Sequence, residues 1–127
     1  MPSKISEQIK KSVLSPATRQ EEGWRGVFRF TPDFIGFAGH FPDRPVLPAV
    51  VQFAIATDVL GQIRGEGFEP MRVHRAKFSA VLGPGMDIAA VVGVKKEEAD
   101  IVTVSCQISG PEGPASSFGM DLQRISG

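Results

Sequence analysis

The chain has 127 residues, of which 42% are hydrophobic and 22% charged, and this fits one globular domain over residues 1–127. Its 14 basic and 14 acidic side chains cancel, so no net field attracts nucleic acid or an anionic membrane. The single cysteine, Cys106, cannot form an internal disulfide, and no apolar stretch is long enough for a signal peptide or for a membrane-spanning helix of roughly 20 residues. We therefore expect a soluble, cytoplasmic protein.

The N-terminal part of the chain predicts a short helix followed by a β-hairpin. Apolar side chains between Ile5 and Leu14 recur every three to four positions, which is typical of an amphipathic helix, although a strand beginning at Val13 fits as well. Residues 21–23 form a turn signal. From Trp24 to Phe30 the sequence alternates, with three aromatic residues and Gly26 on one face and Arg25, Val27 and Arg29 on the other.

The pattern becomes helical from Pro48 to about Ile63, where apolar residues cover most of a helical wheel. The polar interruptions are Gln52, Thr57, Asp58 and Gln62. A helix that is apolar nearly all round is a buried helix. Pro48 suits its first turn, where a missing N–H costs nothing, and Gly65 lies just past its end.

Strands and turns alternate in the remainder of the chain. Period-two patterns and β-branched residues predict strands over Arg72–Val81, Met86–Val94, Ile101–Ile108 and Ser116–Ile125. Turns are predicted at 82–85 and 110–114, and a polar turn at 95–100. An antiparallel sheet on one face would bury only one side of the helix. Its other apolar surface therefore needs a strongly curled sheet or a second copy of the protein.

The segment between the hairpin and the helix concentrates prolines around one histidine. Gly39-His40-Phe41-Pro42 is followed by Pro45-Val46-Leu47-Pro48 and then by Val50-Val51-Gln52. This run resembles the signature of the FabA/FabZ-type 3-hydroxyacyl-acyl-carrier-protein dehydratases of the hotdog fold. Arg75-Ala76-Lys77-Phe78 and the turn Val81-Leu82-Gly83-Pro84-Gly85-Met86 are similar to that family's next strand and turn. The likeness covers residues 14–125.

The resemblance implies an α+β hotdog fold, an antiparallel sheet wrapped around one long central helix, with two subunits joined as a homodimer and an acyl tunnel at their interface. In that family the motif histidine removes a proton beside the thioester carbonyl, and a glycine that opens the helix donates its N–H to that carbonyl. An acidic helix residue of the neighbouring subunit handles the departing hydroxyl. The implied partner is an acyl thioester on acyl carrier protein or CoA, and no cofactor is implied.

The family pattern fits this chain only in part. His40 matches the base, the glycine position is Ala49, and the acid position is Ala54. Alanine keeps the N–H group and adds a methyl group, whereas the loss of a general acid typically costs about a hundredfold to ten-thousandfold in rate. The residues expected to bind substrate are Phe41, Arg44, Pro48, Ala49, Val50, Phe53 and Ala54.

Asp58 lies one helical turn after Ala54 on the same face, where family members often have glutamine. It is a candidate catalytic residue, and the competing interpretation is a partly buried carboxylate that bonds backbone or arginine groups across the dimer. Arg44 and its neighbour Asp43 form either a solvated turn pair or a contact to a phosphopantetheine phosphate.

Basic residues between Arg64 and Lys77 form a local positive stripe, which fits an acidic carrier protein or an ordinary solvated face. His74 and Cys106 are expected to be structural. With only two histidines and no cluster at metal-ligand spacing, no metal site is expected.

Three functions fit these residues. The first is a 3-hydroxyacyl-thioester dehydratase, a lyase of fatty-acid or related lipid metabolism, in which His40 is the base and Asp58, water or substrate replaces the acid. The second is an acyl thioesterase, with Asp58 or His40 activating water against a carbonyl held by the Ala49 N–H. The third is a non-catalytic acyl or carrier-protein binding module. We favour the dehydratase because a decayed enzyme has no need of His40; the acyl chain length, the carrier and any assembly beyond a dimer stay open.

Overall fold

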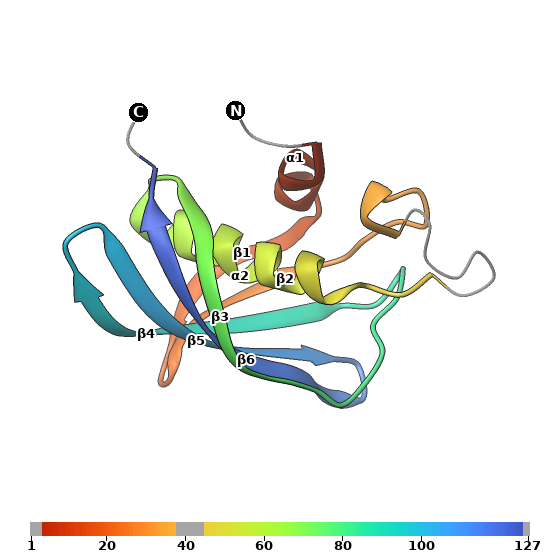
Figure 1. The fold of residues 1–127 in the computed structure, drawn as a ribbon. Helices are drawn as coiled ribbons and strands as arrows, with labels where there is room; N and C mark the ends of the chain where they lie inside the picture. The colour runs from red at the N-terminus through yellow and green to blue at the C-terminus, as the bar shows by residue number, and fades with distance from the viewer. Residues whose placement is uncertain (1–3, 38–44, 126–127) are drawn as a thin grey trace.

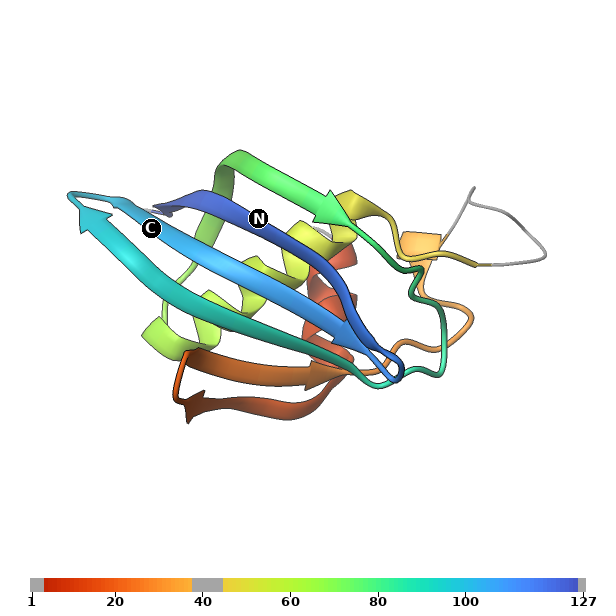
Figure 2. The same ribbon diagram turned by 90° about the horizontal axis from the view of Figure 1, so that it is seen from below.

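The computed structural model describes residues 4–37 and 45–125. A six-stranded sheet has the order β1-β2-β4-β5-β6-β3, and all of its neighbouring strands are antiparallel. The sheet curls around the long helix α2 (Ala49–Arg64), as the two views in Figures 1 and 2 show. The expected α+β hotdog fold is therefore confirmed.

The elements follow one another in the expected order. Their bounds are α1 (Lys4–Lys11), β1 (Val13–Gln20), β2 (Gly23–Phe28), the short 3-10 helix η1 (Ile35–Phe37), α2 (Ala49–Arg64), β3 (Phe68–Phe78), β4 (Ile88–Glu98), β5 (Ile101–Gly110) and β6 (Gly113–Arg124). Val13 begins β1, so the strand alternative is correct at that position. None of the helices in the described part of the chain is long and apolar enough to cross a membrane.

The polar turn predicted at 95–100 is wrong over most of its length, because β4 continues to Glu98. Its charged end pairs with β5 in register, with Lys96 opposite Thr103 and Glu98 opposite Ile101. Ladder hydrogen bonds keep this hairpin extended although its side chains are charged and exposed. A polar composition alone therefore did not indicate a turn.

The concave face of the sheet and α2 share one hydrophobic core. Every second residue of β5 is buried, namely Val102, Val104, Cys106 and Ile108, and α2 buries Val51, Ile55, Ala56, Val59 and Leu60. Full burial of one such large aliphatic side chain stabilises the fold by about 1.5–3 kcal/mol. Helix α1 covers a further side of α2 and buries Ile9, so the apolar helix surface is largely enclosed within one chain.

Both ends of α2 have identifiable signals. Pro48 is the N-cap, with φ −72° and ψ 162°, and makes no side-chain capping bond. Pro48 was expected in the first turn of the helix, and the structure places it one position before the helix. At the other end Gly65 adopts a φ of 68° and its N–H donates to Gly61 O at 2.8 Å; glycine is favoured there because a side chain disfavours this conformation.

Strand β3 lies at one edge of the sheet, beside β6. It starts and ends earlier than the predicted Arg72–Val81. Its register against β6 is irregular between His74 and Lys77, and Arg75 within this irregularity has a φ of 53°. The extra residue shifts the alternation, so His74 and Lys77 share the outer face of the sheet and Phe78 turns toward α2.

Candidate active site

The first two N–H groups of α2 have no hydrogen-bond acceptor among residues 4–37 and 45–125. The N–H groups of Val51 and Gln52 both donate to Pro48 O, at 3.1 and 3.2 Å, so those of Ala49 and Val50 precede the first helical hydrogen bond. Ala49 and Val50 are exposed, and the partial positive charge of a helix is concentrated at this end. This end of α2 is therefore able to bind a carbonyl oxygen or a developing oxyanion.

Two hydrogen bonds hold the residue that precedes Pro48. Leu47 N donates to Leu82 O of the loop after β3 at 2.8 Å, and Leu47 O accepts from Gln52 Nε2 at 3.2 Å. Gln52 is 3% exposed, and its Oε1 accepts from Ser116 Oγ of β6 at 2.6 Å. The sequence analysis missed this pair; the available signal was one amide side chain at a buried position of an apolar helix.

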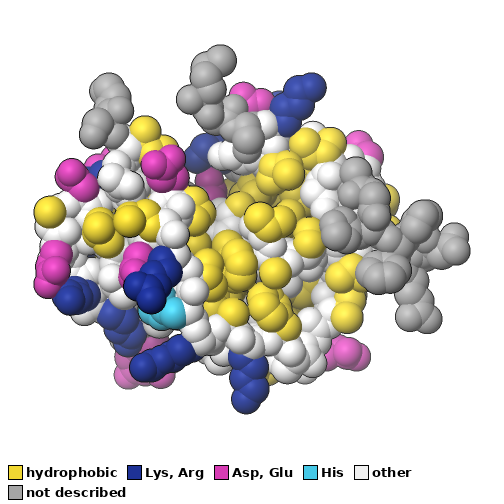
Figure 3. Space-filling view, in the orientation of Figure 1, with side chains coloured by type: hydrophobic (Ala, Val, Ile, Leu, Met, Phe, Trp, Pro, Cys, Tyr) yellow, Lys and Arg dark blue, Asp and Glu magenta, His cyan; other side chains and the backbone are white. Residues whose placement is uncertain are grey.

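An apolar surface adjoins the free N–H groups. Val50 is 68% exposed and Phe78 46% exposed, and the half-buried ring of Phe53 lies 6.2 Å from that of Phe78 and 4.9 Å from that of Phe118. Figure 3 shows apolar side chains gathered in the middle of this face, where the N-terminal half of α2 runs beside β3. An apolar surface next to a few oriented polar groups is the usual form of a small-molecule site.

Ala54 and Asp58 differ in what they offer to a substrate. Ala54 is half-buried against the core, and its methyl group can neither donate nor accept a proton. The Asp58 side chain is 6% exposed; its Oδ1 accepts from Lys10 Nζ at 2.9 Å and its Oδ2 from Gln62 Nε2 at 2.9 Å. These contacts favour the structural interpretation of Asp58. Its partners differ from those expected: they are a lysine and an amide of the same chain and not backbone or arginine groups of a second subunit.

His40, Phe41 and Arg44 lie outside the described residues, so their roles stay predictions. The described chain on either side is nevertheless placed: Phe37 is buried at the end of η1, and Pro45 leads directly into the segment before α2. Pro48, Ala49, Val50, Phe53 and Ala54, the remaining residues expected to bind substrate, lie together at the start of α2.

The basic stripe predicted between Arg64 and Lys77 is divided in the structure. Arg64 donates to both carboxylate oxygens of Glu97, at 2.9 and 3.3 Å, and so ties the C-terminal end of α2 to β4. The exposed basic residues of β3 are Arg72, Arg75 and Lys77. These three remain available to an acidic partner.

The contacts and burial of His74 and Cys106 are compatible with the structural roles expected for them. Thr103 Oγ1 donates to Asp121 Oδ1 at 2.9 Å, and this bond, together with His74 at 3.4 Å from the same oxygen, holds the pKa of Asp121 below its ordinary value. Burial raises the pKa of the Cys106 thiol to about 12, so Cys106 is no nucleophile at neutral pH. Within residues 4–37 and 45–125, no three potential metal ligands come together.

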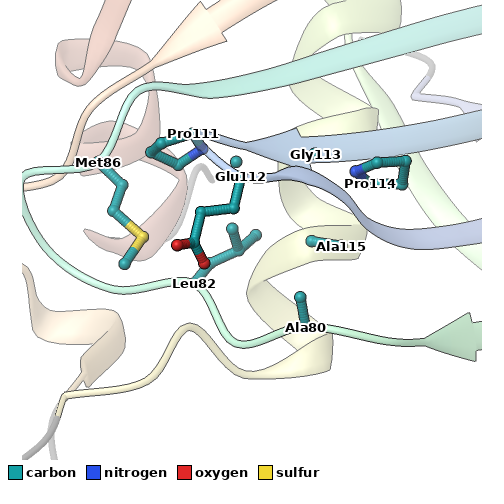
Figure 4. A pocket seen from close by; sticks show the side chains of 9 residues that line it. Ala80, Leu82, Met86, Pro111, Glu112, Gly113, Pro114 and Ala115 are labelled. Atoms are coloured by element: carbon teal, nitrogen blue, oxygen red, sulfur yellow. The ribbon is translucent and has the colours of Figure 1, made fainter.

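A pocket of about 310 Å³ lies between the loop after β3 and the β5–β6 turn (Figure 4). It is lined by Ala80, Leu82, Met86 and residues 110–115, and by none of the predicted site residues that the structure describes. The Glu112 carboxylate extends toward Leu82 and Met86 in Figure 4. The pocket is related to the site indirectly, because the Leu82 carbonyl also holds the segment before α2.

Comparison with known sequences shows one family. Residues 16–116 match the model of the ApeI-like family, described as ApeI dehydratase. The 3-hydroxyacyl-[acyl-carrier-protein] dehydratase FabZ of Levilactobacillus brevis is 34% identical over 88 residues, which are 64% of this chain. The match spans 60% of the length of that curated relative.

Solved structures share the fold at low sequence identity. The dehydratase heterocomplex ApeI:P from Xenorhabdus doucetiae has a TM-score of 0.71 at 18% identity, over 88% of this chain and 96% of that one. A hypothetical thioesterase protein with coenzyme A from Streptococcus pneumoniae has a TM-score of 0.65 at 5% identity, over 96% and 94% of the two chains. At these identities the likeness concerns the fold alone.

Proposed function

Because the chain belongs to the ApeI-like dehydratase family of hotdog proteins, we propose that it removes water from 3-hydroxyacyl thioesters of acyl carrier protein or CoA in the cytoplasm. The observation that supports this most directly is the N-terminus of α2, where the N–H groups of Ala49 and Val50 adjoin the apolar surface of Phe53 and Phe78. The thioester carbonyl fits the N–H groups, and the acyl chain fits the apolar surface.

In the proposed reaction, His40 removes a proton from C2 of the substrate. The electron pair of the broken C2–H bond passes to an enolate whose oxygen is stabilised by the Ala49 N–H and the helix N-terminus. The enolate then forms the C2–C3 double bond while the C3–O bond breaks. The proton held by His40 passes to the leaving hydroxyl, which departs as water and leaves the imidazole neutral. One imidazole in both roles would offset part of the loss of the acid at Ala54.

Each residue expected to bind substrate has a place in this proposal. The acyl chain contacts Phe41, Pro48, Val50, Phe53 and Ala54, and Arg44 meets the phosphate of the carrier's phosphopantetheine. Asp58 has no part in the reaction, because both of its carboxylate oxygens are already hydrogen-bonded.

We further propose that a second subunit pairs with β3. The backbone groups on the outer edge of this strand are available for another strand, and Met71 and Phe78 are 53% and 46% exposed. Exposed apolar side chains along a sheet edge are typical of an interface. A second copy of the chain is the expected partner. Since a second copy brings another Ala54 instead of a carboxylate, a hotdog subunit of different sequence is the alternative partner.

An acyl thioesterase is the second candidate, and Ala54 favours it, because thioester hydrolysis has no leaving hydroxyl that needs an acid. Water activated by His40 would attack the carbonyl bound at Ala49, and the thiol would leave. A non-catalytic binding module is the third candidate and predicts binding without turnover.

One assay separates the three candidates. The purified protein is incubated with 3-hydroxyacyl and saturated acyl thioesters, each on acyl carrier protein and on CoA, while enoyl absorbance and free thiol are measured. We expect enoyl product from the 3-hydroxyacyl substrate, formed at least about a hundredfold more slowly by His40→Ala. Thiol release without enoyl product would establish the thioesterase instead, and binding without either product the module.

A further inference from the structure

Gln52 joins three elements at the N-terminus of α2. Its Nε2 donates to Leu47 O, and its Oε1 accepts from Ser116 Oγ on β6. A carbonyl oxygen can only accept, so the amide has one orientation, with its NH₂ group toward Leu47 and its oxygen toward Ser116. Both Gln52 and Ser116 are buried, and a buried amide with both ends satisfied holds its neighbours in one arrangement.

We propose that Gln52 is a positioning residue that fixes the direction of the Ala49 N–H, a role that rests on the thioester chemistry proposed above. Between the Leu47 carbonyl and the Ala49 N–H lie two planar peptide groups and the backbone of Pro48. The proline ring fixes φ, so the ψ of Pro48 is the one soft dihedral angle between them. That angle is restrained in turn, because Pro48 O, which belongs to the same peptide group as the Ala49 N–H, accepts from Val51 N and Gln52 N. With the Leu47 carbonyl also held, the Ala49 N–H has little freedom of direction.

The need for such a residue follows from the N-cap. Helices usually begin at Ser, Thr, Asp or Asn, whose side chain bonds the first turn and fixes the entering chain. Pro48 has no such group. Gln52 instead reaches back from inside the helix to Leu47 O, while Leu47 N is held by Leu82 O on the other side.

Ser116 connects this arrangement to the sheet. The neighbouring carbonyl, Ala115 O, accepts from Ser79 N at 2.8 Å and from Ala80 N at 3.2 Å. The loop after β3 is therefore bonded to β6 at the residue next to Ser116. Through its bond to Ser116, the Gln52 amide thus connects the N-terminus of α2 to strand β6 of the sheet as well as to the segment before the helix.

Gln52→Met and Gln62→Met form a matched pair of variants. Gln62 also lies on α2 and also makes two side-chain hydrogen bonds, to Asp58 Oδ2 and from Ala17 N, but toward the opposite end of the helix. We expect both variants to lose thermal stability, and Gln52→Met to lose more, because Gln52 is buried whereas Gln62 is exposed. Gln52→Met alone should lower kcat, by about tenfold to a hundredfold, because a misplacement of about 1 Å costs about a hundredfold. The KM should change little, because the acyl contacts stay.

Gln52→Glu provides a test with a side chain of nearly the same shape. Its carboxylate still accepts from Ser116 but cannot donate to Leu47 O, whereas the protonated acid can donate again. The ratio of variant to wild-type kcat should therefore rise as the pH falls. A ratio that does not change with pH, or equal kcat values in Gln52→Met and Gln62→Met, would overturn the positioning role.

Backbone amide measurements separate this role from the proposed reaction. If the wild-type protein converts no thioester, the proposed function fails. Hydrogen exchange of ¹⁵N-labelled protein still tests Gln52: the Leu47 amide, which donates to Leu82 O, should exchange faster in Gln52→Met and be unaffected in Gln62→Met. Unchanged exchange in Gln52→Met would exclude the role whatever the activity.

Discussion

Two alanines at the start of α2 have unequal consequences for the chemistry. Ala49 is the first residue of the helix and is not among the residues with positive φ, so its backbone needs no glycine and its N–H keeps the required role. Ala54 stands where the resemblance to the FabA/FabZ-type dehydratases implies an acid. In the proposed reaction, this departure from the family pattern affects the leaving hydroxyl and not the carbonyl.

Replacement of Ala54 by glutamate should restore part of the missing acid function. We expect Ala54→Glu to raise the rate of enoyl formation by about tenfold or more, because a positioned general acid contributes about a hundredfold to ten-thousandfold. Ala54→Gln, which has the same size and cannot supply the proton, is the control. An equal effect of both variants, measured as kcat on the same 3-hydroxyacyl thioester, would argue against acid catalysis at this position.

We expect Asp58 to contribute to the stability of the fold and not to catalysis. Asp58→Asn weakens the bond to Lys10, and hydrogen bonds to charged groups contribute about 1.5–3 kcal/mol. Chemical denaturation should therefore show a loss of about 1–2 kcal/mol in the free energy of unfolding. The kcat should stay within about twofold. Lys10→Met should cost a similar amount, and the double variant less than the sum of the two. A large loss of kcat at unchanged stability would return Asp58 to the active site.

At the level of elements, an ion-pair network ties the C-terminal end of α2 to the sheet. Arg124 at the end of β6 donates to Glu97 on β4, to Ala99 O at 2.8 Å and to Glu66 at 3.3 Å, and Arg64 of α2 donates to Glu97 as well. The hydrogen bond from Arg124 is the main cause that lowers the pKa of Glu97, with Arg64 adding to it and partial desolvation opposing it.

This network predicts a specific loss of stability in acid. The pKa of Glu97 in the folded protein lies below its ordinary value of 4.5, so its contribution to stability is present above that pH and is lost as the pH falls through the folded value. Melting temperatures measured from neutral pH down to below 4.5 should fall less steeply for Glu97→Gln than for the wild type. Glu98→Gln, which removes a neighbouring exposed carboxylate, should leave the slope unchanged, and 1 M salt should weaken the difference. Parallel slopes for all three proteins would show that the network contributes nothing.

The parts of the fold that could be predicted from the sequence are those determined by residues close together in the chain. The apolar wheel of α2 and the proline-rich segment before it located the helix N-terminus within one residue, because burial and backbone restriction act over a few positions. The irregularity at Arg75 changes which face Phe78 occupies, and strict alternation contains no signal for it. The contact of Gln52 with Ser116 joins residues 64 positions apart, so no local pattern indicates it.

At the scale of the whole molecule, the two edges of the sheet are not equivalent. Strand β1 forms one edge and is followed by the hairpin to β2, whereas β3 forms the other and adjoins the apolar surface of the proposed site. Both edges expose an apolar side chain of similar extent, Leu14 at 49% on β1 and Met71 at 53% on β3. The two positions therefore allow a balanced test of which edge pairs with a second subunit.

A homodimer through β3 predicts that Met71→Glu dissociates the protein and that Leu14→Glu does not. A carboxylate placed in an apolar interface must lose its hydration without a partner, which costs several kcal/mol, whereas the same change at β1 stays in water. Sedimentation should give about twice the chain mass of 13.6 kDa for the wild type and for Leu14→Glu, and the single mass for Met71→Glu. The proposed site lies beside this edge, so enoyl formation should fall together with the dimer. A wild-type monomer would exclude pairing with a second copy and leave β3 to a subunit of different sequence, one able to bring the carboxylate that Ala54 lacks.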